Sequence, residues 1–161
     1  MRKLFLITSL FFITACGFQP AVSWTKVDGP VELVSEQPYS SVQRALRVLV
    51  NQSLAELDEM PENNEVRRIY LAEPEINTDV ISVDANGRPA EYRIEIIQLT
   101  TFTIGDKEEQ QSFRQFRDYV FDVRDILAYQ QQVKQLKQVM SEQLARQILY
   151  TYAARVQLSK S

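Results

Sequence analysis

The chain has 161 residues, a length that suits one domain, and 45% of them are hydrophobic, which is enough to build a core. Its formal charge of -3 argues against a nucleic-acid-binding protein, because such proteins carry a strongly basic surface. Histidine is absent and cysteine occurs once, which excludes histidine-dependent nucleophilic catalysis, a histidine or cysteine zinc site and an internal disulfide.

The first 15 residues have the layout of a secretory signal peptide. Arg2 and Lys3 form a basic start, and an apolar run of about ten residues follows, too short to span a bilayer as a helix. Two small residues then precede Cys16, so we expect cleavage directly before that cysteine. An ordinary secreted protein with a stray cysteine is the alternative interpretation.

The sequence Ile-Thr-Ala-Cys at 13–16 resembles the lipobox of bacterial lipoproteins. The resemblance implies diacylglycerol on the Cys16 thiol and an acyl group on the freed amine, and several chains anchor a protein more stably than one. Residue 17 is Gly rather than Asp, which by resemblance to lipoprotein sorting favours the outer membrane of a Gram-negative cell. Residues 16–30 have no clear period and read as the lipidated N-terminus and a tether, followed by one domain over 31–161.

The first regular elements are a short strand and a helix. Loose alternation predicts a strand at 31–34. Ser40 and Gln43 have the spacing of a capping box, and apolar residues from Val42 to Leu57 recur at helical spacing. One apolar face predicts a helix lying on a sheet, and we expect Pro61 and its polar neighbours to end this element.

The sequence pattern over residues 66–123 predicts a series of β-strands. Pro74 makes 66–83 either one interrupted strand or two short ones, and Asn86-Gly87 predicts a tight hairpin turn. Residues 89–104 carry apolar side chains on both alternating faces, which a doubly buried strand or a bulge would explain. Gly105 predicts the next turn, and the residues after it predict a further strand that runs back beside 89–104.

The last element is one long helix over about 125–158, which contains no Pro or Gly and has Asp125 as a plausible N-cap. Its apolar residues step by three or four from Ile126 to Tyr152. The other face is rich in Gln, which suits either plain solvent or a polar protein lumen. The element order predicts an α+β two-layer sandwich, with two helices on one face of a mostly antiparallel sheet of about four strands.

Three segments resemble the LptE family of lipopolysaccharide-assembly lipoproteins. They are Cys-Gly-Phe at 16–18, an Asn-Gly turn leading into an alternating strand at 86–96, and an aromatic strand running into a helix at 116–132. The resemblance implies an outer-membrane lipoprotein that plugs and helps assemble the LptD β-barrel and assists lipopolysaccharide delivery to the outer leaflet. It implies no enzymatic activity and no cofactor beyond the covalent lipid on Cys16.

Lipopolysaccharide carries phosphates, and the planar guanidinium of arginine donates paired hydrogen bonds to phosphate. The candidate contacts are Arg88, Arg93, Arg117 and Arg124. Acidic residues lie nearby, so local salt bridges are the alternative for each arginine. Candidate contacts with the barrel are Tyr92, Phe116 and Tyr119, since interfaces favour aromatic residues, although each also suits the core.

Two other function classes remain open. A ligand-binding lipoprotein of another envelope lipid transporter would need a closed apolar pocket between the sheet and the helices. A glycan hydrolase would need two facing carboxylates. The nearest candidates for a hydrolase are Glu56, Asp58 and Glu59, but neighbouring helix residues point in different directions, as at any solvated helix end.

Overall fold

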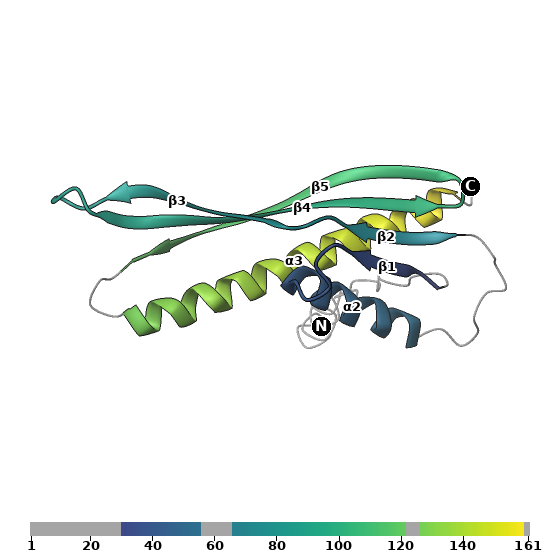
Figure 1. Ribbon diagram of the computed structural model, residues 1–161, viewed down its shortest axis with the longest axis horizontal. Coiled ribbons are helices and arrows are strands. Elements are labelled where there is room, and N and C mark those ends of the chain that lie inside the picture. Colours follow the sequence, from purple (N-terminus) through teal and green to yellow (C-terminus); the bar gives the residue numbers. More distant parts are fainter. Residues whose placement is uncertain (1–29, 56–65, 122–125, 160–161) are drawn as a thin grey trace, which may run out of the picture.

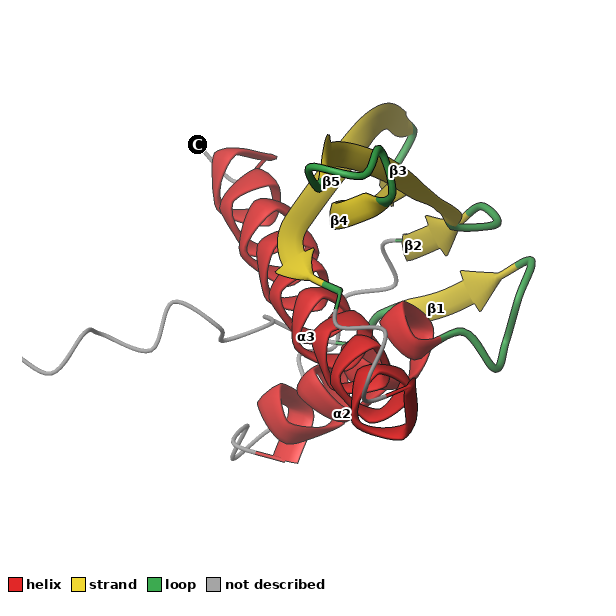
Figure 2. Ribbon diagram, turned by 90° about the vertical axis from the view of Figure 1, so that its left-hand side faces the viewer, coloured by secondary structure: helices red, strands yellow, loops and turns green. Residues whose placement is uncertain are grey.

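Two layers, a five-stranded sheet and a pair of helices, lie against each other (Figures 1 and 2). The computed structural model describes residues 30–55, 66–121 and 126–159. In chain order the elements are β1 (Glu32–Ser35), α2 (Ser41–Ala55), β2 (Arg67–Leu71), β3 (Glu75–Val83), β4 (Pro89–Ile104), β5 (Lys107–Val120) and α3 (Ile126–Ser159). The predicted α+β sandwich is confirmed, with five strands in place of about four.

The longest strand, β4, organises the sheet. On one side it pairs along almost its whole length with β5, from Glu91 opposite Val120 to Ile104 opposite Lys107. On its other side it pairs first with β3 and then with β2, both antiparallel, and β1 joins β2 in parallel. The sheet is therefore four strands wide at one end and three strands wide at the other.

The three-stranded end is called here the distal ribbon, residues 75–97 and 114–120. Its hairpin forms where the sequence predicts it, because Gly87 adopts a positive φ of 76° that other residues rarely take. The chain also breaks between β2 and β3 around Pro74, so residues 66–83 form two strands.

Neither a doubly buried strand nor a bulge explains the apolar side chains that β4 carries on both of its faces. Its pairing with β5 contains no bulge, and the register shifts lie where β3 and β4 pair near the hairpin turn, between Val80 and Val83. Even-numbered residues of β4 face the helices and are mostly buried, whereas Leu99 on the other face is 37% exposed. The apolar residues on the second face are thus only partly covered.

The start of α2 shows how local sequence sets a helix boundary. Ser40 Oγ accepts a hydrogen bond from the backbone N–H of Gln43 at 3.2 Å, as an N-cap does. The reciprocal half of the predicted capping box is absent, because the Gln43 side chain is buried instead. The predicted extension of this helix to Leu57, its end at Pro61, and the Asp125 cap lie outside the described residues.

The core lies between the sheet and α3, with α2 packed beside them. α3 contributes Met140, Leu144, Ile148 and Tyr152, all fully buried, as its predicted stripe requires. They meet inward residues of β2 and β4, among which Ile69 and Phe102 are at most 1% exposed. α3 has 34 residues and β4 has 16, so each spans about 50 Å and the two layers match in length.

Candidate functional site

The tip of the distal ribbon is fixed by one carboxylate. Asp84 Oδ1 accepts hydrogen bonds from the backbone N–H groups of Asn86 at 2.8 Å and Arg88 at 2.9 Å. The Arg88 guanidinium also donates to Asp84 Oδ2, at 3.0 Å from Nε. These bonds, led by that from the Arg88 backbone, hold the pKa of Asp84 below its usual value. Arg88 is thus exposed but engaged in a local ion pair, as the alternative interpretation holds.

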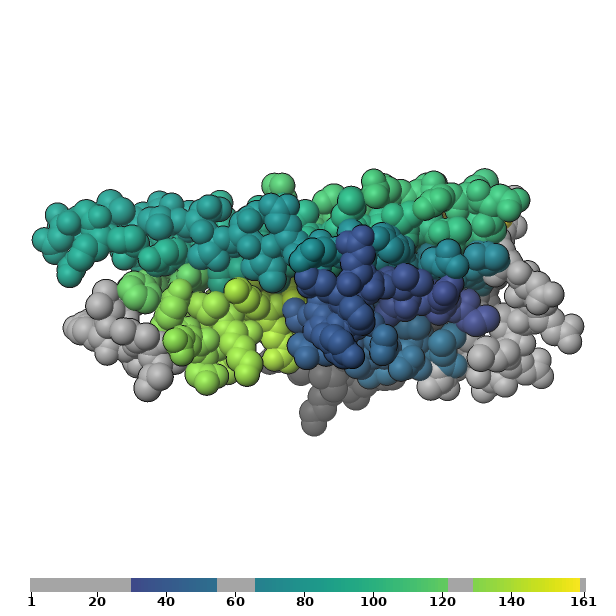
Figure 3. Space-filling model, in the orientation of Figure 1, coloured from purple at the N-terminus to yellow at the C-terminus, as the bar shows by residue number. Residues whose placement is uncertain are grey.

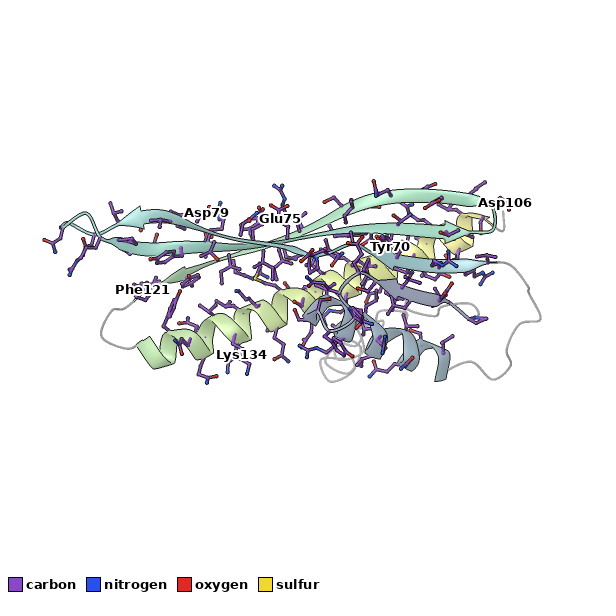
Figure 4. All side chains as sticks on the ribbon, in the orientation of Figure 1. Tyr70, Glu75, Asp79, Asp106, Phe121 and Lys134 are labelled. Carbon is purple, nitrogen blue, oxygen red and sulfur yellow. The ribbon has the colours of Figure 1, made fainter. Side chains whose placement is uncertain are left out.

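The outer face of the distal ribbon, turned away from the helices, carries cross-strand ion pairs. Arg93 donates to both oxygens of Asp118, at 2.7 and 2.9 Å, and its guanidinium lies 4.7 Å above the Phe116 ring. Arg114 pairs with Glu95 at 3.2 Å. The hydrogen bond from Arg93 lowers the pKa of Asp118, and Asp118 raises that of Arg93. Figure 4 labels two further acidic residues, Glu75 and Asp79, on the same side of the ribbon.

An aromatic cluster holds the inner face of the distal ribbon against α3. The rings of Tyr92 and Tyr119 stack at 5.5 Å, and Phe121 and Tyr129 meet edge to face at 4.8 Å. The hydroxyls of Tyr119 and Tyr129 lie 3.0 Å apart, and burial raises the pKa of Tyr119. Figure 4 shows Phe121 on the helix side of the ribbon end. Tyr119 is therefore a core residue, and Tyr92 is half-buried beside it.

Arg117 faces the helices, as its shared side with Phe113 and Tyr119 indicates. Its guanidinium donates to the Gln143 side chain of α3 at 2.9 Å and to the Phe116 carbonyl at 2.9 Å. It thereby links the sheet to the long helix. The other two candidates, Arg124 and the lipid-attachment candidate Cys16, lie outside the described residues.

Exposed apolar side chains gather on the same ribbon. Phe116 is 49% exposed, Val83 60% and Val120 67%. In the space-filling view the teal residues of β3 and β4 form the left-hand end of the molecule, beyond the helical layer (Figure 3). Exposed apolar surface of this kind can mark a contact with a protein, a membrane or a ligand. Of the three aromatic candidates, only Phe116 is placed to make such a contact.

Sequence reasoning missed the partners that fix these side chains. Alternation and helical spacing place Phe121 and Tyr129 on apolar faces, but they do not show that the two rings meet in one aromatic cluster. The pairing of Arg93 with Asp118 required the β4–β5 register, which begins from the turn at Gly105 and could have been counted from it. Nothing in the sequence indicated Gln143 as the partner of Arg117.

Within the described residues, no helix combines the length and apolar character that a membrane span requires. The same part of the chain holds no group of three or more Cys, Asp or Glu side chains arranged to bind a metal ion. The geometry offers ion pairs and exposed aromatic and aliphatic surface.

Comparisons with known proteins give a consistent result. The family profile described as LptE, lipopolysaccharide-assembly, matches residues 30–151. Among solved structures, the fold is similar to that of the rare lipoprotein B from Shewanella oneidensis, with a TM-score of 0.70 and 22% identity over 81% of this chain and 98% of that one.

Two other solved structures share the fold. A lipoprotein B from Nitrosomonas europaea has a TM-score of 0.65 and 17% identity, covering 80% of this chain and 84% of that one. A minor lipoprotein from Acinetobacter baumannii has a TM-score of 0.57 and 17% identity, covering 80% and 93%. No curated protein sequence matches the chain.

Proposed function

Because the chain belongs to the LptE family of lipopolysaccharide-assembly lipoproteins, we propose that it plugs the LptD β-barrel, helps that barrel assemble and assists lipopolysaccharide delivery to the outer leaflet. The family match over residues 30–151 is the observation that carries this proposal. The family is not enzymatic, so the protein acts through binding and positioning.

The proposal includes an anchor in the outer membrane. Cleavage after residue 15 would leave Cys16 at the N-terminus, where diacylglycerol on the thiol and an acyl group on the amine would hold the chain in the bilayer. Residues 16–30 would then tether the single domain formed by 31–161. The support is the order of basic start, apolar run, small residues and sole cysteine.

The partner surface in this proposal is the outer face of the distal ribbon. Phe116 gives it a half-exposed aromatic ring, Val120 adds aliphatic surface, and Val83 is exposed beside the turn at its tip. The ion pairs of Arg93 and Arg114 surround that apolar surface with charge. Interfaces commonly combine an apolar centre with a polar rim, so this face suits a broad contact with a barrel wall. Tyr92 and Tyr119 would support this partner surface from the inner face of the ribbon, where their rings pack together.

Lipopolysaccharide phosphates would meet the arginines of the ribbon. Arg88 at the tip and Arg93 on the outer face are exposed, and each already binds a carboxylate. A phosphate would therefore have to share or displace Asp84 or Asp118. Arg117 faces α3 and binds Gln143, which favours a supporting role. Arg124 completes the proposed set.

Depletion of the protein in its own cells tests the proposal. We expect less correctly folded LptD in the outer membrane and less lipopolysaccharide at the cell surface, both restored by the wild-type chain. A chain with Cys16→Ala should restore neither fully, because the anchor is lost. Unchanged LptD folding and unchanged surface lipopolysaccharide after complete depletion would contradict the proposal.

A further inference from the structure

Charge is divided unevenly between the two layers. α2 and α3 contain six Lys and Arg residues and a single carboxylate, Glu142. The five strands contain six Lys and Arg residues but eight Asp and Glu residues. A chain with an overall charge of -3 thus has a clearly positive helical layer. Such local excess attracts anions even when the whole molecule is acidic.

A groove of about 730 Å³ runs between α2 and α3. The two helices meet beside it, where the hydroxyls of Ser41 and Ser141 lie 2.7 Å apart. Apolar side chains line part of the groove, and these are Ala45, Val48, Leu49 and Val133. Val48 is 54% exposed, although it is aliphatic. The groove therefore offers an uncovered apolar surface within the positive layer.

Four of the helical cations line the same groove: Arg44, Lys134, Lys137 and Arg146. Figure 4 shows Lys134 on the side of α3 that faces away from the sheet. In the described part of the chain, no carboxylate pairs with any of the four, whereas Arg68, Arg93 and Arg114 of the sheet all have acidic partners. Glu142, at the groove edge, accepts a hydrogen bond from Gln138 instead.

An apolar surface flanked by unpaired cations matches the chemistry of an anionic amphiphile. Arginine and lysine bind phosphate well, arginine through two parallel hydrogen bonds. The volume lies in the range of ordinary small-ligand sites, which suits one acyl chain and a head group rather than a whole multi-chain glycolipid. We propose that the α2–α3 groove binds the phosphate and one acyl chain of an anionic phospholipid.

A bilayer phospholipid is the favoured source because of the length of the proposed tether. Cys16 and Pro30 are 14 residues apart, so the anchor of the proposed function would keep Pro30, where the domain begins, within roughly 50 Å of the membrane surface. The groove lies on the helical layer, whereas the arginines proposed for lipopolysaccharide lie on the distal ribbon. The phospholipid site is therefore separate from the contacts of the proposed function.

Calorimetry with dodecyl phosphate, kept below its micelle-forming concentration, tests the groove directly. The protein is the mature chain with Cys16→Ala, so that no attached lipid competes. We expect binding that weakens with salt and falls at least about tenfold in the double variant Arg44→Gln, Lys137→Gln, because two phosphate contacts are lost. Val48→Ser, an exposed change, should also weaken binding.

Arg68→Gln is the matched control, because it removes one exposed arginine from the sheet and should change affinity less than about twofold. Circular dichroism verifies that every variant is folded. Equal binding by the double variant, or equal binding of dodecyl maltoside or inorganic phosphate, would overturn the proposal. Tighter groove-dependent binding to lipopolysaccharide than to phosphatidylglycerol vesicles would overturn the phospholipid assignment. None of these binding measurements involves LptD, so their failure is distinguishable from failure of the proposed function.

Discussion

Asp84 shows how one side chain can organise a β-turn. Its carboxylate accepts two backbone N–H groups within the β3–β4 turn and pairs with Arg88. Because its pKa is lowered in the folded state, the carboxylate stabilises the fold above the ordinary Asp pKa of about 3.9, and this contribution is lost as pH falls through the lower folded value.

A carboxyl NMR titration measures this effect. We expect the Asp84 midpoint to lie below about 3.9, and to stay lowered in Arg88→Ala, because the backbone N–H of residue 88 remains the main donor. Asp84→Ala should reduce the free energy of unfolding at pH 7 and lose that deficit in acid. A normal Asp84 midpoint in the wild type would show that the turn does not close in this way.

Gly87 permits a second test at the same turn. Its φ is 76°, and a Cβ added there would meet no atom within 4 Å, so backbone strain alone opposes substitution. Gly87→Ala should lower the free energy of unfolding by about 1–2 kcal/mol, measured by urea denaturation. Gly87→Asn should cost less, since Asn tolerates the left-handed conformation. Equal stability of the Ala variant and the wild type would contradict the turn geometry.

The residue pattern predicted the tight turn at the ribbon tip, but not the partner that each arginine binds. Alternation along the strand suffices to put Arg117 on one face with Phe113 and Tyr119, yet its partner Gln143 lies 26 residues away on another element. Local charge patterns did favour ion pairs for Arg88 and Arg93, which the structure contains. Long-range partners depend on how layers pack, and local sequence does not encode that packing directly.

Among the elements, α3 supplies the largest share of the buried core. Leu144 is fully buried between the layers, whereas Gln147, one turn along, is exposed. Leu144→Ala should lower the free energy of unfolding by about 2–5 kcal/mol, because it removes buried methyl groups and leaves a cavity. Gln147→Ala should change it by less than about 0.5 kcal/mol. Chemical denaturation of both variants measures the difference, and equal stability would contradict this packing.

At the scale of elements, the helices, the hairpin and the break at Pro74 followed from local signals. The arrangement of β2 and β3 in series along one side of β4 did not, because periodicity identifies strands without assigning their neighbours. The reciprocal capping-box bond was also predicted wrongly. Burial of the Gln43 side chain prevailed over its local bond to the helix start.

The whole molecule separates its surfaces by layer. Apolar and ion-paired side chains occupy the outer face of the sheet, while unpaired cations line the groove of the helical layer. This division gives the proposed barrel contact and the proposed phospholipid site different faces. The basic excess of the two helices could have been counted from their sequences, but the groove that gathers four of those cations required the packing of α2 on α3.

Site-specific photocrosslinking in intact cells tests the central claim, the proposed contact with LptD, most directly. A photoreactive amino acid would replace Phe116 on the outer face, and in a second strain Arg88 at the ribbon tip. The account predicts that both positions capture LptD in the outer membrane, while a probe at Gln147 on α3 captures less. Capture of no barrel protein from either ribbon position, with the protein present in that membrane, would contradict it.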